Sequence, residues 1–398
     1  MKIIFLTLMY SEKQLQHAFR YSKRGVQMAA HTFQSRLCRG LRAIEGASLN
    51  VVSCAPVGSF PMNYKRLLIP GEKSGNDTAV GFVDLPKVKY TLQEQLLYTR
   101  VKGMLREDEP AVLLIYSLHL PFMRVAAKLK QHFPKLKVCL IQTDAVPGVN
   151  DMEKRMTKEA HERGQKLLRL SSCCDGYVIL TEYLQDALQI GNRPYTVVEG
   201  IAGEVPSVTP ATLTAKNAAQ RTFFYSGSLN SAFGFNVLAQ AFLQLEDKLV
   251  ICGAGDYLPQ LLEDIRNNPK KNIEYLGYLT PEEVSKRRCT ADFLINPRQP
   301  SGTYTKYSFP SKTMEYLASG VPTVMYRLEG IPAEYDAYLN YLTGTTAQEM
   351  ADQLRQLCAA DYTPLAEKAA AGREFVLKNK NEYVQAKKIY DLLNDLVQ

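Results

Sequence analysis

The sequence predicts an α/β protein built from two doubly wound, Rossmann-like domains. A chain of 398 residues is too long for one ordinary hydrophobic core, which indicates two or three domains. Short apolar runs alternate with stretches of helical period, and this is typical of repeated β-α-β units with a parallel sheet. A segment rich in Pro, Ser, Thr and Ala separates two such halves, between Gly203 and Gln220.

The first predicted domain covers residues 1–205. Its apolar runs predict strands at 2–8, 48–56, 111–117, 137–144, 175–181 and 195–200. The stretches between them predict helices at 13–45, 91–107, 121–133, 151–171 and 181–190. A long polar connection runs from Gly58 to Tyr90. We therefore expect a parallel sheet with helices on both faces.

The second predicted domain covers residues 206–379 and repeats the pattern. Strands are predicted at 221–229, 247–255, 273–279, 291–297 and 322–326. Helices are predicted at 234–245, 257–267, 281–289, from about Ser311, and at 346–359. The last stretch, 364–396, is helical, and we expect residues 380–398 to fold back and complete the first domain.

Composition and cysteine usage favour a cytoplasmic protein. No apolar run approaches the roughly 20 residues that cross a bilayer, and we interpret the short run after Lys2 as a first buried strand rather than a signal peptide. Eight cysteines show no metal-ligand spacing, and scattered thiols fit a reducing compartment.

Positive charge is concentrated in the first half of the chain. Residues 1–205 hold 28 Lys and Arg against 19 Asp and Glu, and only Glu12 is acidic between residues 11 and 42. The cations of that segment are Lys13, Arg20, Lys23, Arg24, Arg36, Arg39 and Arg42. They form either a solvated helix face or a surface for anionic lipid or a phosphorylated acceptor. Nucleic acid is disfavoured, because no aromatic interleaving or known module accompanies the charge.

Strand ends in the second half offer groups suited to a nucleotide. In a doubly wound sheet, ligands bind at the carboxyl ends of the strands. These ends carry Gly227, Ser228, Gly253, Gly255, Tyr278 and Arg298. Small residues let a phosphate reach backbone N–H groups, and Tyr278 suits stacking on a base. The Gly-x-Gly at 253–255 equally fits a tight turn, since Leu258 stands where a dinucleotide fingerprint has its third glycine.

The segment "FPSKTMEYLASG" combines an anion site with a carboxylate. A helix beginning near Ser311 exposes first-turn N–H groups that bind phosphate, and Lys312 adds a positive charge. Glu315 lies one helical turn further on, where a carboxylate can accept from both ribose hydroxyls. The alternative is that Glu315 pairs with Lys312 at i, i+3 on a solvated face.

Three stretches of the second half carry a family resemblance. They are "RTFFYSGSLNSAFGFNVL", "LVICGAGD" with "IEYLGYLTPEEV", and "YSFPSKTMEYLASGVPTV". In this order they resemble retaining sugar-nucleotide glycosyltransferases of the GT-B fold, in particular the bacterial capsule and exopolysaccharide branch. Glu315 matches the family's ribose-binding Glu, whereas Tyr307 replaces the Glu that reaches the donor sugar. The family's Lys after the first strand is missing, so Arg298 or Lys312 would neutralise the diphosphate.

The first half supplies candidates for the acceptor side. His119 follows a strand, where the resemblance implies a His near the donor sugar; the alternative is a loop residue without a role. Asp144 ends the next strand and either orients an acceptor hydroxyl or caps the following helix.

The resemblance implies sugar transfer with retention from a nucleotide diphosphate sugar. It implies no protein nucleophile, and we expect no metal ion or other cofactor. The expected partners are the donor, a lipid-linked or oligosaccharide acceptor, and an anionic membrane at the inner face of the cell membrane. Two other classes stay open. One is a sugar-nucleotide epimerase of the same fold, and the other is a non-catalytic binding partner with a degenerate cleft.

Overall fold

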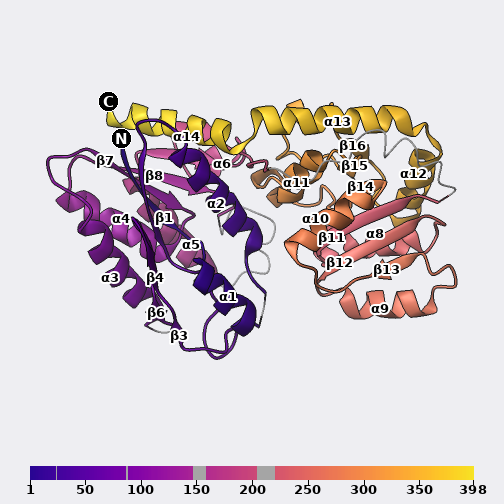
Figure 1. Ribbon diagram of the computed structural model, residues 1–398, viewed down its shortest axis with the longest axis horizontal. Coiled ribbons are helices and arrows are strands. Elements are labelled where there is room, and N and C mark those ends of the chain that lie inside the picture. Colours follow the sequence, from indigo (N-terminus) through magenta and orange to yellow (C-terminus); the bar gives the residue numbers. More distant parts are fainter. Residues whose placement is uncertain (24, 87, 147–157, 204–219) are drawn as a thin grey trace. The chain divides into compact units, whose positions relative to one another are not determined.

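The computed structural model describes the chain except for residues 24, 87, 147–157 and 204–219. It divides into two compact units, Met1–Ile201 with Glu382–Gln398, and Ala202–Asn381 (Figure 1). The sequence placed these boundaries at 205/206 and at 379/380. Each unit is α/β with a mainly or wholly parallel sheet, as predicted. Most of the predicted linker, the start of the helix predicted at 151–171, and Arg24 lie outside the described residues.

The first unit contains an eight-stranded sheet in the order β10-β9-β8-β7-β1-β2-β5-β4. Its pairs are parallel except for β4 with β5. The strands are β1 (Lys2–Thr7), β2 (Ser48–Ser53), β4 (Glu72–Ser74), β5 (Asp77–Ala79), β7 (Ala111–Tyr116), β8 (Leu136–Gln142), β9 (Gly176–Ile179) and β10 (Tyr195–Val197). The expected polar connection thus contains β4 and β5, and also a small antiparallel pair, β3 (Leu68–Ile69) and β6 (Phe82–Val83). Strands of two or three residues are too short to show a period of two.

The clearest difference between the predicted and observed helices of this unit lies between residues 13 and 45. The helix expected over 13–45 is divided into α1 (Glu12–Tyr21) and α2 (Met28–Arg42). Gly25 between them has a φ of 84°, which a continuous right-handed helix cannot contain. The other helices are α3 (Lys89–Lys102), α4 (Leu120–His132), α5 (Lys158–Leu170), the short η2 (Ser171–Cys173), α6 (Leu184–Ala187) and α14 (Glu382–Val397).

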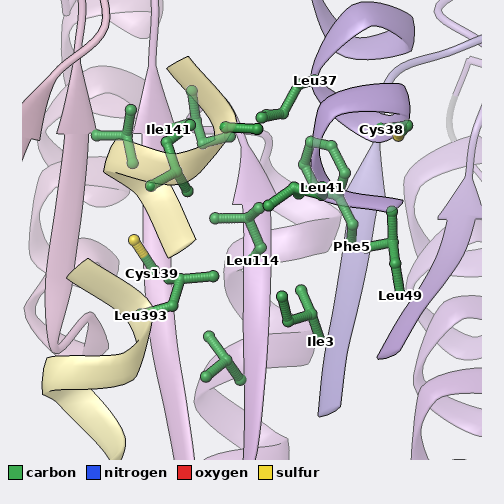
Figure 2. Packing of buried hydrophobic residues seen from close by; sticks show 14 of the residues in the cluster. Ile3, Phe5, Leu37, Cys38, Leu41, Leu49, Leu114, Cys139, Ile141 and Leu393 are labelled. Carbon is green, nitrogen blue, oxygen red and sulfur yellow. The ribbon is translucent and has the colours of Figure 1, made fainter. Parts of the chain in front are cut away.

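The core of the first unit lies between its sheet and two helices from opposite ends of the chain. Leu37 and Leu41 of α2 and Leu393 of α14 pack on apolar strand residues such as Phe5 and Leu114 (Figure 2). The helical stretch predicted at 364–396 is therefore two helices, α13 (Tyr362–Asn379) in the second unit and α14 in the first. Burial of the apolar face of α14 explains why the chain returns to this sheet.

The second unit contains a six-stranded, wholly parallel sheet in the order β13-β12-β11-β14-β15-β16. The strands are β11 (Thr222–Ser228), β12 (Lys248–Ala254), β13 (Ile273–Tyr275), β14 (Phe293–Asn296), β15 (Thr323–Tyr326) and β16 (Asn340–Leu342). Besides α13, the helices are α8 (Phe235–Phe242), α9 (Leu258–Asn267), α10 (Pro281–Thr290), α11 (Ser311–Ser319) and α12 (Ala347–Ala359), with short 3₁₀ turns η3 (Ser231–Phe233), η4 (Thr303–Tyr307) and η5 (Ala333–Tyr335).

Each sheet reverses its strand order at one place, and this determines where a ligand can bind. In the first unit the reversal lies between β1 and β7, and in the second between β11 and β14. Connections leave a doubly wound sheet in opposite directions there, which opens a crevice at the carboxyl ends of the strands. His119 follows β7, Gly227 and Ser228 end β11, and Arg298 follows β14.

We predict that Gly40→Ala destabilises the first unit. A Cβ atom at Gly40 of α2 would lie 2.1 Å from the carbonyl oxygen of Glu382 in α14. Overpacking of this kind costs about 1–3 kcal/mol, which outweighs the advantage of roughly 1 kcal/mol that Ala has over Gly in a helix. Urea unfolding should therefore show a lower midpoint.

The matched control is Gly103→Ala, at the end of α3. Its added Cβ would lie 3.6 Å from the nearest heavy atom, and its φ of −66° suits Ala. Equal unfolding midpoints for the two variants would contradict the close α2–α14 contact.

Candidate functional site

The start of α11 leaves backbone N–H groups available for an anion. The helix begins at Ser311, as predicted, and its N-cap residue, Pro310, makes no side-chain capping hydrogen bond. The N–H of Thr313 donates to the carbonyl oxygen of Pro310 at 2.9 Å. Because an α-helix has no internal partners for its first N–H groups, and its dipole is positive there, this end of α11 favours negative charge.

Lys312 fills the space that Gly227 leaves open at the end of β11. A Cβ atom on Gly227 would lie 2.4 Å from Nζ of Lys312 and 2.5 Å from its Cε. Gly227 also has a φ of 148°, which other residues rarely adopt. Nζ lies 5.6 Å from the ring centroid of Tyr225 below it. The glycine at this strand end thus admits a lysine amine.

Two arginines share the electrostatic surroundings of Lys312. Burial lowers the pKa of Lys312, and nearby Arg298 and Arg288 lower it further, whereas Glu315 raises it. We call these four residues the cation cluster. It contains three cations and one carboxylate, so it carries two surplus positive charges. A bound diphosphate would relieve the repulsion between the cations.

Arg298 is held beside Lys312 from β14. Its N–H donates to Oδ1 of buried Asn296 at 3.4 Å, and its guanidinium donates to Oγ of Ser308 at 3.0 Å. The guanidinium carbon also lies 5.6 Å from the ring centroid of Phe233. Arg298 and Lys312, the two residues proposed to replace the missing lysine, are therefore brought to the same place. Tyr307, where the resemblance expects a Glu, is buried.

Glu315 pairs with Arg288 rather than with Lys312. Arg288 donates to Oε2 of Glu315 at 2.9 Å and to its carbonyl oxygen at 3.3 Å. Within the described ranges, no ion pair joins Glu315 to Lys312, so the i, i+3 alternative is wrong. Sequence analysis missed Arg288. The available signal was that Arg288 follows Val284 by four residues, on the face of α10 that packs against the core.

Gly253 and Gly255 have a packing role. A Cβ atom on Gly253 would lie 1.9 Å from the carbonyl oxygen of Gly227, and one on Gly255 would lie 2.3 Å from the carbonyl carbon of Leu229. The ends of β11 and β12 approach so closely that side chains do not fit there. Ser228 is exposed, and Tyr278 is 76% exposed and accessible for stacking.

His119 lies at the crevice position of the first unit with its ring enclosed. Ring centroids of Phe122 and Tyr90 lie 4.8 Å and 5.7 Å away. Burial lowers the pKa of His119 to about 3, with help from Arg163 and Lys89, so its imidazole is neutral at pH 7. Its buried Nε2 has no hydrogen-bond partner among the residues that the structure describes.

Gln142 joins the segments that carry His119 and Asp144. Buried at the end of β8, it accepts from the N–H of Leu118 at 3.0 Å and donates to the carbonyl oxygen of Asp144 at 2.7 Å. The carboxylate of Asp144 is exposed and accepts from Thr143 at 3.3 Å. The helix-cap alternative for Asp144 depends on residues 147–157, which lie outside the described residues. Sequence reasoning missed Gln142 because a glutamine in a strand carries no signal of its contacts.

The expected basic surface between residues 11 and 42 needs correction. Arg39 forms an ion pair with Glu382, and Arg42 forms one with Asp77. Arg36 donates to the carbonyl oxygen of Ile201 at 2.7 Å. Lys23 donates to the carbonyl oxygen of Pro61 at 2.8 Å. Acidic and carbonyl partners from distant parts of the sequence thus engage at least four of the seven cations, which local charge counting does not detect.

The described residues contain no group of three or more His, Cys, Asp or Glu side chains arranged to hold a metal ion. They also contain no helix that is both long and apolar enough to cross a membrane.

Comparison with known proteins extends the fold assignment. Residues 220–360, within the second unit, match the family model described as glycosyl transferases group 1. No curated protein sequence matches that of this chain at a significant level.

Solved structures resemble the whole chain in fold. The sucrose-phosphate synthase of Thermosynechococcus elongatus is 13% identical, with a TM-score of 0.66 over 100% of this chain and 99% of that one. A UDP-forming trehalose-phosphate synthase from Burkholderia vietnamiensis is 11% identical, with a TM-score of 0.66 over 99% of each chain. The lipopolysaccharide outer core galactosyltransferase WaaB is 11% identical, with a TM-score of 0.63 over 99% of each. The chain therefore has the GT-B fold of two Rossmann-like domains.

We predict that the Lys312 pKa responds to its neighbours in opposite directions. It should lie below that of an ordinary lysine; Arg288→Met should raise it by removing a cation, and Glu315→Gln should lower it by removing an anion. NMR titration of ¹³C-methylated lysines measures this. Lys286 is the internal reference, because Glu282 raises its pKa. A Lys312 pKa insensitive to both substitutions would contradict the cation cluster.

Proposed function

We propose that this protein is a glycosyltransferase that moves a sugar from a nucleoside diphosphate sugar to an acceptor. The observation that carries the proposal is the cation cluster, placed beside the uncapped start of α11 at the strand-order reversal of the second unit. The match of residues 220–360 to glycosyl transferases group 1 supports the same assignment. A UDP-forming synthase among the similar folds supports a nucleoside diphosphate as the leaving group.

The donor is proposed to bind along α11. Its phosphates lie at the N–H groups of Ser311 and Lys312 and beside the Lys312 amine and Arg298. Its ribose lies one turn further on, where the second oxygen of Glu315, Oε1, faces the hydroxyls. Its base stacks on exposed Tyr278. This order follows from chemistry, because cations suit phosphate and a carboxylate suits vicinal hydroxyls.

The proposed reaction transfers the sugar with retention and uses no protein nucleophile. The bond between the anomeric carbon and the diphosphate oxygen breaks, and the acceptor hydroxyl attacks from the same face. Lys312, Arg298 and the α11 amides stabilise the charge on the departing diphosphate, which takes up the acceptor's proton. Since His119 is neutral, we assign it a hydrogen bond to the donor sugar rather than proton transfer. We assign Asp144 to the acceptor hydroxyl. This proposal assigns no step to a metal ion or other cofactor.

A panel assay tests the proposal and separates it from the alternatives. Purified protein is incubated with UDP-, ADP- and GDP-sugars, and released nucleoside diphosphate is measured. A transferase releases diphosphate from one donor slowly by hydrolysis, and faster by sugar transfer when an acceptor is added. An epimerase converts the sugar without releasing much diphosphate. A binding partner that lacks activity leaves every donor intact, and that result would overturn the proposal.

We predict that Glu315→Ala weakens nucleotide binding. The loss should be about 1.5–3 kcal/mol, the usual value of a hydrogen bond to a charged group. Calorimetry with UDP, ADP and GDP measures it, and Glu329→Ala, outside the cluster, is the control. Unchanged affinity in a folded Glu315→Ala protein would show that this carboxylate does not hold the ribose.

We further propose that the acceptor is lipid-linked and used in cell-surface polysaccharide synthesis at the inner face of the membrane. One similar fold is named a lipopolysaccharide galactosyltransferase. The first unit also exposes large apolar side chains on adjoining segments, with Phe19 of α1 59%, Met62 76% and Leu68 66% exposed. The segments adjoin because Ser22 bridges to Tyr64.

Basic residues belong to the same two segments. Arg20 and Arg66 both lie over the ring of Tyr21, and Lys23 and Lys65 are exposed. Together with Phe19, Met62 and Leu68 we call this the α1 surface. A protein that binds at a membrane interface inserts apolar side chains at the lipid boundary and places basic side chains at the headgroups. Each cation near an anionic leaflet contributes about 1 kcal/mol.

We predict that the protein binds anionic vesicles and that the α1 surface is responsible. Co-sedimentation should be strong with anionic vesicles, absent with neutral ones, and weaker at high salt. Arg20→Gln with Arg66→Gln should abolish it, whereas Arg39→Gln with Arg42→Gln, whose side chains are ion-paired, should leave it nearly unchanged. Equal binding to both lipid types would mean that the α1 surface is only solvated.

A further inference from the structure

Arg288 is a buried cation in the last turn of α10. It is 5% exposed, although an arginine is seldom fully buried unless it is paired. The position of α10 is determined at its other end, where Thr280 and Glu283 form a capping box. The helix leads directly into β14, one of the two strands at the crevice position. Arg288 thus reaches the site from a well-anchored element.

The guanidinium of Arg288 holds both the side chain and the main chain of Glu315. It donates to Oε2 at 2.9 Å and to the carbonyl oxygen at 3.3 Å. Its central carbon lies 5.9 Å from the ring centroid of Tyr316, which is fully buried. One donor binds the carboxylate and the other binds the main chain of the same residue, so the side chain of Glu315 is held against a guanidinium that its own backbone helps to position.

The two partners differ in exposure, so one side of the ion pair is buried and the other faces solvent. The side chain of Arg288 is 6% exposed, whereas that of Glu315 is 36% exposed. Oε2 faces the buried guanidinium, and Oε1 accepts no hydrogen bond from the described part of the chain. The carboxylate therefore presents one oxygen in one orientation. Ordering it before the ligand arrives reduces the entropy lost on binding.

The pair also affects Lys312. Glu315 and Lys312 are three residues apart on α11, a spacing at which a carboxylate and an amine readily pair. Such a pair would neutralise both of the groups proposed to bind donor. Arg288 holds Oε2 of the carboxylate through one donor, which leaves the Lys312 amine for an anion.

We propose that Arg288 is a positioning residue for the donor: it fixes Glu315 in its ribose-binding orientation and withholds it from Lys312. This inference rests on the proposed function, because it requires a ribose at Glu315. Arg288 itself touches no part of the donor. Its effect on affinity therefore depends on Glu315 and on the ribose hydroxyls, and a role in stability alone would not have that dependence.

The test compares each ribonucleotide with an analogue that lacks the hydroxyls. Affinities for UDP, ADP and GDP, and for their 2′,3′-dideoxy forms, are measured by calorimetry on folded wild type and Arg288→Met. The substitution should weaken binding of the preferred ribonucleotide at least about tenfold, the scale of a charged hydrogen bond. It should weaken binding of the dideoxy form clearly less, because that form loses the free Lys312 amine but no ribose contact.

Three controls accompany it. Arg287→Met, at the exposed neighbouring position, should change neither affinity. Arg288→Lys keeps the charge and one donor, so it should restore part of the discrimination, and it serves if Arg288→Met fails to fold. In a Glu315→Gln background, Arg288→Met should have no further effect on ribonucleotide affinity.

The outcomes separate the two proposals. If wild type binds none of the three diphosphates, the proposed function fails and this inference fails with it. If wild type binds a ribonucleotide but Arg288→Met weakens both forms equally, or weakens neither, only the positioning role is overturned.

Discussion

The close approach of β11 and β12 at their carboxyl ends is the constraint on which the candidate site depends. Gly227 and Gly253 bring the two backbones together, and the space above Gly227 admits the Lys312 amine. The strand order reverses between β11 and β14, so β11 has β12 on one side and β14 on the other. Arg298 follows β14. A side chain at residue 227 would displace the amine and separate the parts of the cluster.

The charges within the cation cluster give its members different roles. Lys312 is partly buried near two arginines, which lower its pKa, so it gains most from a bound anion. Arg288 is committed to Glu315, and the pair leaves Lys312 and Arg298 as the surplus charge. The first unit has a different character, because the enclosed His119 is neutral and Gln142 joins its segment to that of Asp144. The proposed division into donor and acceptor sides follows these differences.

Helices, strands and several site residues were predictable from the sequence where the pattern that indicates them involves residues close together along the chain. Alternating apolar runs predicted the long strands, and the Pro-Ser-Lys turn predicted the start of α11 at Ser311. Helical spacing placed Lys312 and Glu315 on one helix. The two-residue strands β3 and β6 escaped detection, and Gly25 divided a helix predicted as continuous, because neither feature changes apolar periodicity. Arg288 and Gln142 escaped because their partners are distant in sequence.

The sequence by itself determined the class of fold, the approximate position of each long strand and the residue types near its end, since these depend on neighbours along the chain. Tertiary structure alone decided which charges meet. It paired Glu315 with Arg288 instead of Lys312, and it engaged Arg39 with Glu382. The physical reason is that an ion pair or a packed face depends on distance in space. Residues 39 and 382 become neighbours only once two apolar helix faces are buried together.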